Sequence, residues 1–310
     1  MRYPVLAAAL AVTLVGGCSP RSSAPNTQAD LTSGSITVVC SPEARAIISR
    51  CAEAFQALYP RARIELRAGT SRDAIAALFG ARADVAVITR ELVPEERRAA
   101  VQGRLEVDGY RFARDAAVVV GNVANPVDNL TLDDVRRIYR GEIRSWSELG
   151  GPAIPVVPVV QAPDADVTEF FSEEVLGGEA IKAQSIRDSA DLDVVRTVRE
   201  QPGAVGYVTL SNAGQGARAV RLAAMKGLPY YAADLERVHD GKYPVTRFYN
   251  LYVRAKGPEL ANGFITYVTS RDGQTLVREA GLVPTSVPVR FVRRSPMLST
   301  HTLGDSLGTP

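Results

Sequence analysis

Histidine, cysteine, methionine and tryptophan are scarce in this 310-residue sequence, which contains two, three, three and one of them respectively. His301 lies in a polar C-terminal stretch and His239 in a polar, loop-like stretch, so neither is favoured as a general base. The sequence also has no G-x-S-x-G elbow, P-loop, H-E-x-x-H helix or dinucleotide fingerprint. We therefore expect no catalytic residue, no metal site and no cofactor, and we predict that the protein is not an enzyme.

Neither sign of charge is in excess. The chain has 36 basic and 34 acidic residues, a net charge of +2, and these charges are interspersed rather than collected in blocks. Such a balance produces no strong field that would attract nucleic acid. With 46% hydrophobic residues, the chain can bury one large core or two modest ones.

The apolar run near the N-terminus is too short to span a bilayer. It extends from Val5 to Val15, whereas a membrane-spanning helix needs about 20 residues. A basic residue precedes the run and V-G-G-C ends it, which is the layout of a secretory signal peptide. The same four residues resemble a bacterial lipobox, in which Cys18 is acylated; the alternative is a signal peptide that merely contains a cysteine. We predict a signal peptide with lipobox at 1–18 and a flexible tether, rich in Ser, Pro, Thr and Asn, at 19–33.

The two remaining cysteines are predicted to stay reduced. Export permits disulfides, but Cys40 ends a predicted strand and Cys51 lies well along the helix that follows. At about 1.5 Å rise per residue, Cys51 is more than about 10 Å from the helix start. Because bridged Cα atoms lie within about 7 Å of each other, we expect two buried thiols.

Apolar, β-branched runs alternate with runs of helical periodicity through most of the chain, which predicts a mainly parallel sheet with helical crossovers. The same order of elements recurs after a crossing at 115–120, and a return crossing is predicted at 248–253. The other predicted strands are 36–39, 63–67, 84–89, 156–160, 185–188 and 204–210. The predicted helices include those at 42–58, 73–79, 191–199, 260–269 and 272–280.

Residues 114–151 join a buried strand, a turn and a helix that begins after Thr131 and ends at Gly141. Their sequence resembles that of the phosphate-type solute-binding proteins of ABC transporters, in which a strand is followed by N-P, x-N-L-T, I-[FY]-x-G-x-I-x-x-W and G-G. The later P-G-A-V-G-Y-V at 202–208 and the F-I-T-Y-V and G-Q motifs before G-L-V-P at 281–284 are also similar to that family. The matching residues in the first stretch are Asn125, Pro126, Asn129, Leu130, Thr131, Ile138, Tyr139, Gly141, Ile143, Trp146, Gly150 and Gly151.

The resemblance implies an α/β fold with two lobes, the type II periplasmic-binding fold, built from two doubly wound, mainly parallel sheets joined by two hinge crossings. The expected first lobe comprises 34–114 and 249–294, and the expected second lobe comprises 115–248. Residues 295–310 are predicted to be a disordered tail, because they are polar and rich in Ser, Thr, Gly and Pro.

Hydroxyl side chains follow several predicted strands. In doubly wound sheets, ligands bind where strands end and helices begin, and helix N-termini favour anions. Taken singly, each hydroxyl is also explained as an N-cap. By the family resemblance, however, these loops fall on its phosphate-binding loops, and the residues expected to contact the ligand are Ser41, Thr70, Ser71, Thr89, Arg90, Asp164 and Thr168.

The loop at 162–168 departs from the family. It reads A-P-D-A-D-V-T, where the family has R-x-[DE]-G-S-G-T. Ala162 therefore stands at the arginine position and Asp166 at the serine position, while Ala165 and Val167 replace glycines. The close backbone approach and the bidentate partner of a phosphate cradle are thereby lost.

Asp166 adds a negative charge near an expected anion, which is repulsive by about 1 kcal/mol in water and by more when desolvated. Its side chain can point outward, pair with Arg90 and close the site, or belong to a pocket for a ligand that carries a positive group. The ligand's identity therefore stays open.

Two functions of different classes remain. The first is an extracytoplasmic, lipid-anchored, monomeric solute-binding protein that captures a small anion, phosphate by resemblance, between its lobes and presents it to an ABC-transporter permease. The second is a binding-fold lipoprotein with an eroded anion cradle that acts as a sensor or scaffold or binds another ligand. Both place the protein in the periplasm or cell envelope, attached to the membrane only by its lipid, and neither involves nucleic acid.

Overall fold

A computed structural model of the chain describes residues 30–285. The predicted signal peptide, Cys18, most of the predicted tether and the predicted tail lie outside the described residues. Between residues 30 and 285, no helix is both long and apolar enough to cross a membrane.

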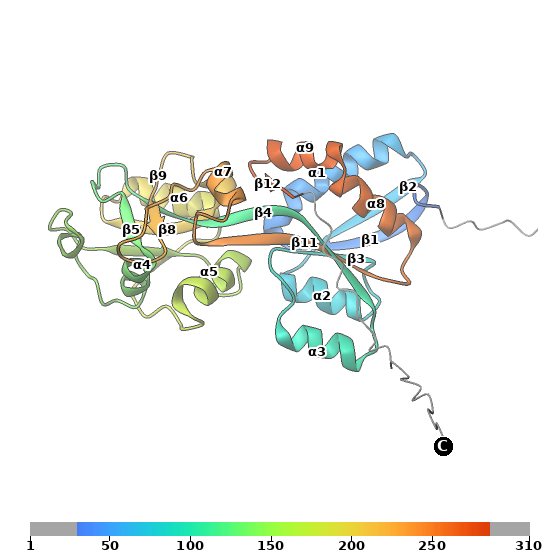
Figure 1. Ribbon diagram of the computed structural model, residues 1–310, viewed down its shortest axis with the longest axis horizontal. Helices are drawn as coiled ribbons and strands as arrows, with labels where there is room; N and C mark the ends of the chain where they lie inside the picture. The colour runs from blue at the N-terminus through green and yellow to red at the C-terminus, as the bar shows by residue number, and fades with distance from the viewer. Residues whose placement is uncertain (1–29, 286–310) are drawn as a thin grey trace, which may run out of the picture.

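The first lobe is an α/β unit whose central strand has a parallel neighbour on each side: β1 lies between β2 and β3. Its helices α8 and α9 come from the C-terminal part of the chain and pack beside α1 (Figure 1). The elements are β1 (Gly34–Cys40), α1 (Pro42–Leu58), β2 (Ala62–Ala68), α2 (Ser71–Phe79), β3 (Val85–Ile88), α3 (Pro94–Gln102), α8 (Glu259–Thr269) and α9 (Arg271–Glu279).

The second lobe repeats this plan with a parallel set of β8, β6 and β7, and a small separate sheet of β10 and β5 lies beside it. Two short 3₁₀ helices cover Trp146–Leu149 and Leu210–Asn212. The other elements are β5 (Asn129–Thr131), α4 (Leu132–Tyr139), β6 (Val157–Val160), α5 (Asp166–Leu176), β7 (Ile186–Arg187), α6 (Asp191–Glu200), β8 (Ala204–Thr209), β9 (Arg218–Ala219), β10 (Arg221–Ala223) and α7 (Leu235–His239).

Two long antiparallel strands run between the lobes, β4 (Val107–Gly121) and β11 (Thr246–Arg254), as Figure 1 shows. β4 pairs with β11 and with β12 (Val283–Pro284) over its first part, and with β8 and β9 over its last part. The strands therefore follow one another in the order β2-β1-β3-β11-β4-β8-β6-β7. The two predicted sheets are continuous through β4.

Alternate residues of the first-lobe strands pack into cores on opposite faces of the sheet. Val38 and Val85 join the core beneath α1, α8 and α9, whereas Val39 and Ala86 join the core beneath α2. A separate core fills the second lobe around β8 and the aromatic side chains of Tyr139, Phe171 and Tyr207. Covered faces on both sides explain why β3 and β8 read as nearly continuous apolar runs.

The predicted two-lobed fold is confirmed. The predicted helix N-cap at Thr131 is also confirmed, because its side chain forms a capping box with Asp134. Cys40 and Cys51 are buried, unbridged thiols, as expected. The stretch around His239 is different from the expectation, because it forms the short helix α7 rather than a loop.

Candidate ligand-binding site

The site begins at the N-terminus of α2, directly after strand β2. Thr70 is the N-cap, and its hydroxyl and backbone N–H are held by Asp73 in a capping box. This local pair fixes the first turn of the helix. As a result, the backbone N–H and the hydroxyl of the buried Ser71 face the second lobe.

The acceptor that meets these donors is the carboxylate of Asp166, from the first turn of α5 in the second lobe. The Ser71 hydroxyl donates to it over 2.6 Å, the Ser71 N–H over 3.3 Å and the Thr89 hydroxyl over 2.8 Å. Asp166 is 8% exposed. It therefore neither points outward nor pairs with Arg90, whose guanidinium forms two 2.8 Å hydrogen bonds with Glu96.

A second carboxylate crosses the cleft in the opposite direction. Glu43, in the first turn of α1 in the first lobe, accepts a 2.7 Å hydrogen bond from the N–H of Val167, at the N-terminus of α5. Each of the two helix N-termini, α2 and α5, thus receives a carboxylate from the other lobe. Helix N-termini carry partial positive charge, so both contacts are electrostatically favourable.

Arg247, the second residue of β11, is the cation at the centre of this cluster, and its side chain is 2% exposed. It lies directly opposite Asp115 in the β11–β4 register and donates to that carboxylate over 2.9 and 3.1 Å. It also forms an ion pair with Glu43 and approaches the Thr89 hydroxyl at 3.4 Å. The Tyr249 hydroxyl completes the shell of Asp115 at 3.1 Å. A buried ion pair needs such additional partners.

Burial shifts the protonation equilibrium of Glu43. Removal from water raises the pKa of Glu43 to about 7, although the charge of Arg247 acts in the opposite direction. The negative charges of Asp166, Asp191 and Asp115 raise it further. The cluster contains the three carboxylates of Glu43, Asp115 and Asp166 and one cation, Arg247. This excess of carboxylates distinguishes it from a plain anion pocket.

The other predicted site residues occupy different positions. Ser41 follows β1 and is fully buried, and its hydroxyl has no hydrogen-bond partner within residues 30–285. Thr168 is buried against the Tyr207 hydroxyl at 3.0 Å. Asp164 is exposed to solvent. The structure thus brings Ser71 and Thr89 together on one acceptor, places Ser41 at the adjacent strand end and leaves Asp164 outside.

An open cavity of about 870 Å³ lies between the lobes. Arg72 and Arg90 line it from the first lobe, and Gln161, Thr168 and Arg187 line it from the second. Arg72 and Thr168 are each within two residues of a residue of the carboxylate cluster. The cavity therefore borders the inter-lobe site.

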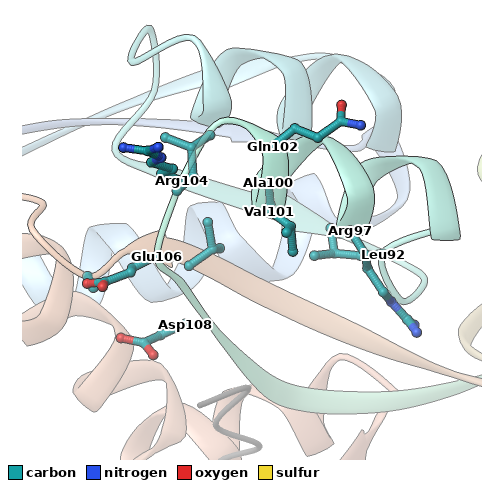
Figure 2. Close-up of a pocket in the computed structure, with 11 residues that line it drawn as sticks. Leu92, Arg97, Ala100, Val101, Gln102, Arg104, Glu106 and Asp108 are labelled. Carbon is teal, nitrogen blue, oxygen red and sulfur yellow. The ribbon is translucent and has the colours of Figure 1, made fainter. Parts of the chain in front are cut away.

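A second cavity, of about 750 Å³, lies on the first lobe between α3 and the start of β4. Figure 2 shows Val101 and Ala100 on the helix, with Glu106 and Asp108 on the opposite side. Only Leu92 is common to both cavities. None of the predicted site residues lines this second cavity.

Sequence reasoning did not identify Glu43, Asp115 and Arg247 as site residues. A signal for two of them is present, because Asp115 and Arg247 are opposite charges at the starts of two apolar runs that were both predicted to be crossings. Charges in such positions require a buried partner. Glu43 has no comparable signal, since an acidic residue in a first helical turn is ordinary.

Comparison with known proteins places this geometry in context. The family model described as "PBP superfamily domain" matches residues 25–272. The phosphate-binding protein PstS of Bacillus subtilis is 26% identical over 259 residues, which is 81% of this chain and 81% of that protein. The PstS of Pseudomonas aeruginosa is 24% identical over 274 residues, which is 81% and 83% of the two chains.

Solved structures show the same fold. One is a putative phosphate ABC transporter substrate-binding protein with bound phosphate from Clostridium perfringens, with a TM-score of 0.70 and 24% identity over 81% of this chain and 100% of that one. Another is an ABC-type phosphate transport receptor from Vibrio cholerae, with a TM-score of 0.71 and 21% identity over the same shares.

Proposed function

We propose, on the premise that this chain belongs to the PBP superfamily, that it is the solute-binding protein of an ABC importer and captures a small oxyanion between its lobes, with phosphate as the first candidate. The named relatives are phosphate-binding proteins of such transporters. Capture by this fold is closure of two lobes about a solute, in which no bond is made or broken.

One observation carries the proposal, namely the convergence of three donors on a single oxyanionic group. The Ser71 N–H, the Ser71 hydroxyl and the Thr89 hydroxyl all contact the carboxylate of Asp166. Hydrogen bonds to an ionised acceptor are about twice as strong as neutral ones. A set of donors that satisfies a carboxylate at a helix N-terminus is suited to a phosphate oxygen as well. The buried hydroxyl of Ser41, at the neighbouring strand end, has no partner among residues 30–285 and offers a further donor.

The lipid anchor, the lobe boundaries and the remaining solute contacts are proposed from the sequence. We infer that Cys18 is lipidated after export, so that the monomeric protein is tethered to the membrane and delivers its solute to a permease. We also propose that the first lobe comprises 34–114 and 249–294, that the second comprises 115–248, and that Thr70, Arg90, Asp164 and Thr168 contact the solute when Asp166 does not fill the cradle.

A second candidate function has one observation in its favour. Because the cradle is filled by a side chain of the chain itself, the fold can serve as a sensor or scaffold that no longer transports a solute. Both functions predict the same fold. They differ in whether a free oxyanion binds.

The test is a titration of purified, solute-free protein with phosphate, sulfate and molybdate, followed by calorimetry and thermal unfolding. At a hundred times its dissociation constant, a ligand stabilises the native state by about 2.7 kcal/mol. We expect a saturable response to at least one oxyanion. Ser71→Ala should weaken it, because that change removes one of the three donors while the Ser71 N–H and the Thr89 hydroxyl remain, and the matched control Ser49→Ala, on the exposed side of α1, should not. The absence of any response up to millimolar concentrations would favour the second function.

A further inference from the structure

We propose that the carboxylate of Asp166 is a built-in ligand: it occupies the oxyanion position of the α2 cradle, holds the lobes closed without solute, and must leave before a solute anion binds. This inference rests on the proposed function and adds to it a competitor that belongs to the chain itself. Affinity for the solute is then set by the balance between an intramolecular and an external anion.

The contacts of Asp166 are those of a bound anion. Its two oxygens accept from one backbone N–H and two hydroxyls of the opposite lobe, over 2.6 to 3.3 Å, and the residue is 8% exposed. The Thr89 hydroxyl is in turn approached by the Arg247 guanidinium. A second anion cannot share these donors without close repulsion between like charges in a poorly solvated site. Binding of the solute therefore requires the displacement of Asp166.

Glu43 makes the arrangement reciprocal. Asp166 brings a second-lobe carboxylate to the N-terminus of α2, and Glu43 brings a first-lobe carboxylate to the N–H of Val167 on α5. A single solute anion between two opposed helix N-termini would satisfy both. Here the two carboxylates supply that charge, one for each helix.

The contacts between the lobes are concentrated in the first turn of α5. Besides Asp166 and Val167, this turn carries Glu169, which forms a 3.5 Å ion pair with Arg72 of α2. The Arg72 side chain is 77% exposed, so this pair contributes little on its own. Release of Asp166 therefore removes three of the four hydrogen bonds that this turn makes across the cleft and leaves the one from the Val167 N–H to Glu43. The lobes can then separate about β4 and β11.

The test uses two variants. Asp166→Asn keeps the shape of the side chain but removes its charge, and Asp166→Ser also shortens the side chain so that it no longer reaches Ser71 and Thr89. Asp133→Asn is the matched control, because Asp133 is an exposed carboxylate of the same lobe on α4. Phosphate affinity is measured by calorimetry, and the radius of gyration is measured by small-angle X-ray scattering with and without phosphate. Far-UV circular dichroism establishes that each variant is folded.

We expect both Asp166 variants to bind phosphate about tenfold or more tightly than the wild type, since removal of one like charge at close range is worth at least about a factor of ten. The solute-free wild type should be compact, and phosphate should not compact it further. The solute-free Asp166 variants should be larger and should contract when phosphate is added. Asp133→Asn should behave as the wild type does.

The outcomes separate this inference from the function on which it rests. Equal or weaker phosphate binding by both folded variants, with a wild type that is open until phosphate is added, overturns the role of Asp166 and leaves phosphate capture intact. Binding by the variants alone supports the built-in ligand and moves the wild type to the sensor or scaffold function. If no protein binds phosphate, phosphate capture fails, and the solute-free radii alone decide: an enlarged Asp166→Asn supports the inference, and an unchanged one overturns it.

Discussion

At the scale of single residues, the inter-lobe site is defined by how one buried cation and three carboxylates are partnered. Arg247 and Asp115 face each other across two strands and satisfy each other. Glu43 also pairs with Arg247, and Glu43 and Asp166 each meet a helix N-terminus of the opposite lobe. Each carboxylate is satisfied only while the lobes are together, since its partners belong to the other lobe. The carboxylates of Glu43 and Asp166 thus supply, at the two helix N-termini, the negative charge that a bound solute anion would supply.

The raised pKa of Glu43 predicts how the stability of the protein depends on pH. Burial raises this pKa from 4.5 to about 7, so the folded state holds the proton more tightly than the unfolded chain does. Where the unfolded chain has ionised and the folded state has not, raising the pH favours unfolding. The free energy of unfolding should therefore fall between about pH 4.5 and pH 7 and then level off. The loss attributable to Glu43 is up to about 3 kcal/mol, because one pKa unit corresponds to about 1.4 kcal/mol.

Urea denaturation of the wild type and of Glu43→Gln at several pH values between 5 and 8 measures this contribution. The stability of the wild type relative to Glu43→Gln should decrease as the pH rises, because glutamine does not titrate. Glu53→Gln, an exposed position on the same helix, should keep the pH profile of the wild type. Parallel profiles for the wild type and Glu43→Gln would show that Glu43 is ionised throughout this range.

At the scale of secondary structure, close packing of α6 on β8 depends on a glycine. A Cβ at Gly206 would lie 2.5 Å from Cγ1 of Val194 and 3.4 Å from Cγ2 of Val198, both on α6. Valine side chains in a helix have one strongly preferred rotamer and cannot easily turn away. Gly206→Ala should therefore force the helix from the sheet and cost about 1 to 3 kcal/mol.

The measurement is the urea midpoint followed by the fluorescence of Trp146, the single tryptophan, which is buried in the same lobe. Gly214→Ala is the matched control, because within the described part of the chain no atom beyond its own neighbours lies within 4 Å of a Cβ at that position. It should change stability by less than about 0.5 kcal/mol. Equal midpoints for the two alanine variants would contradict the packing argument.

Most elements are predictable from the sequence because their signals are local. Runs of β-branched residues, proline and glycine at the ends of helices, and the capping pair of Thr131 and Asp134 all act within a few residues. The two crossings at β4 and β11 are also predictable, from the way the order of elements repeats. The short strands β5, β9, β10 and β12 are not, since their two or three residues are defined by distant partners.

The candidate site is only partly predictable, for the same reason. The carboxyl ends of strands locate Ser71 and Thr89, and the altered loop identifies Asp166 as unusual. The contacts of Ser71 and Thr89 with Asp166 span 95 and 77 residues and depend on how the lobes face each other. The ion pair of Arg247 with Glu43 spans 204 residues. No local pattern in the sequence specifies either distance.

At the scale of the whole molecule, one strand, β4, pairs with strands of both lobes. The first part of β4 pairs with β11 in the first lobe, and residues 117–121 pair with β8 in the second. Hydrogen-bonded strands therefore continue from β2 to β7 without interruption. A hinge of this kind lets the lobes rotate but couples their folding, because neither sheet is complete without β4.

This continuity predicts a single unfolding transition for both lobes. Urea unfolding followed by Trp146 fluorescence, which reports on the second lobe, should coincide with unfolding followed by far-UV circular dichroism, which reports on both. Ala117→Pro should separate the two curves, since it removes the hydrogen bond from the Ala117 N–H to the Val245 carbonyl in the middle of the crossing. Ala117→Gly, which keeps that N–H, should lower both midpoints together. Two separate transitions in the wild type would mean that the lobes fold independently and that β4 serves only as a tether between them.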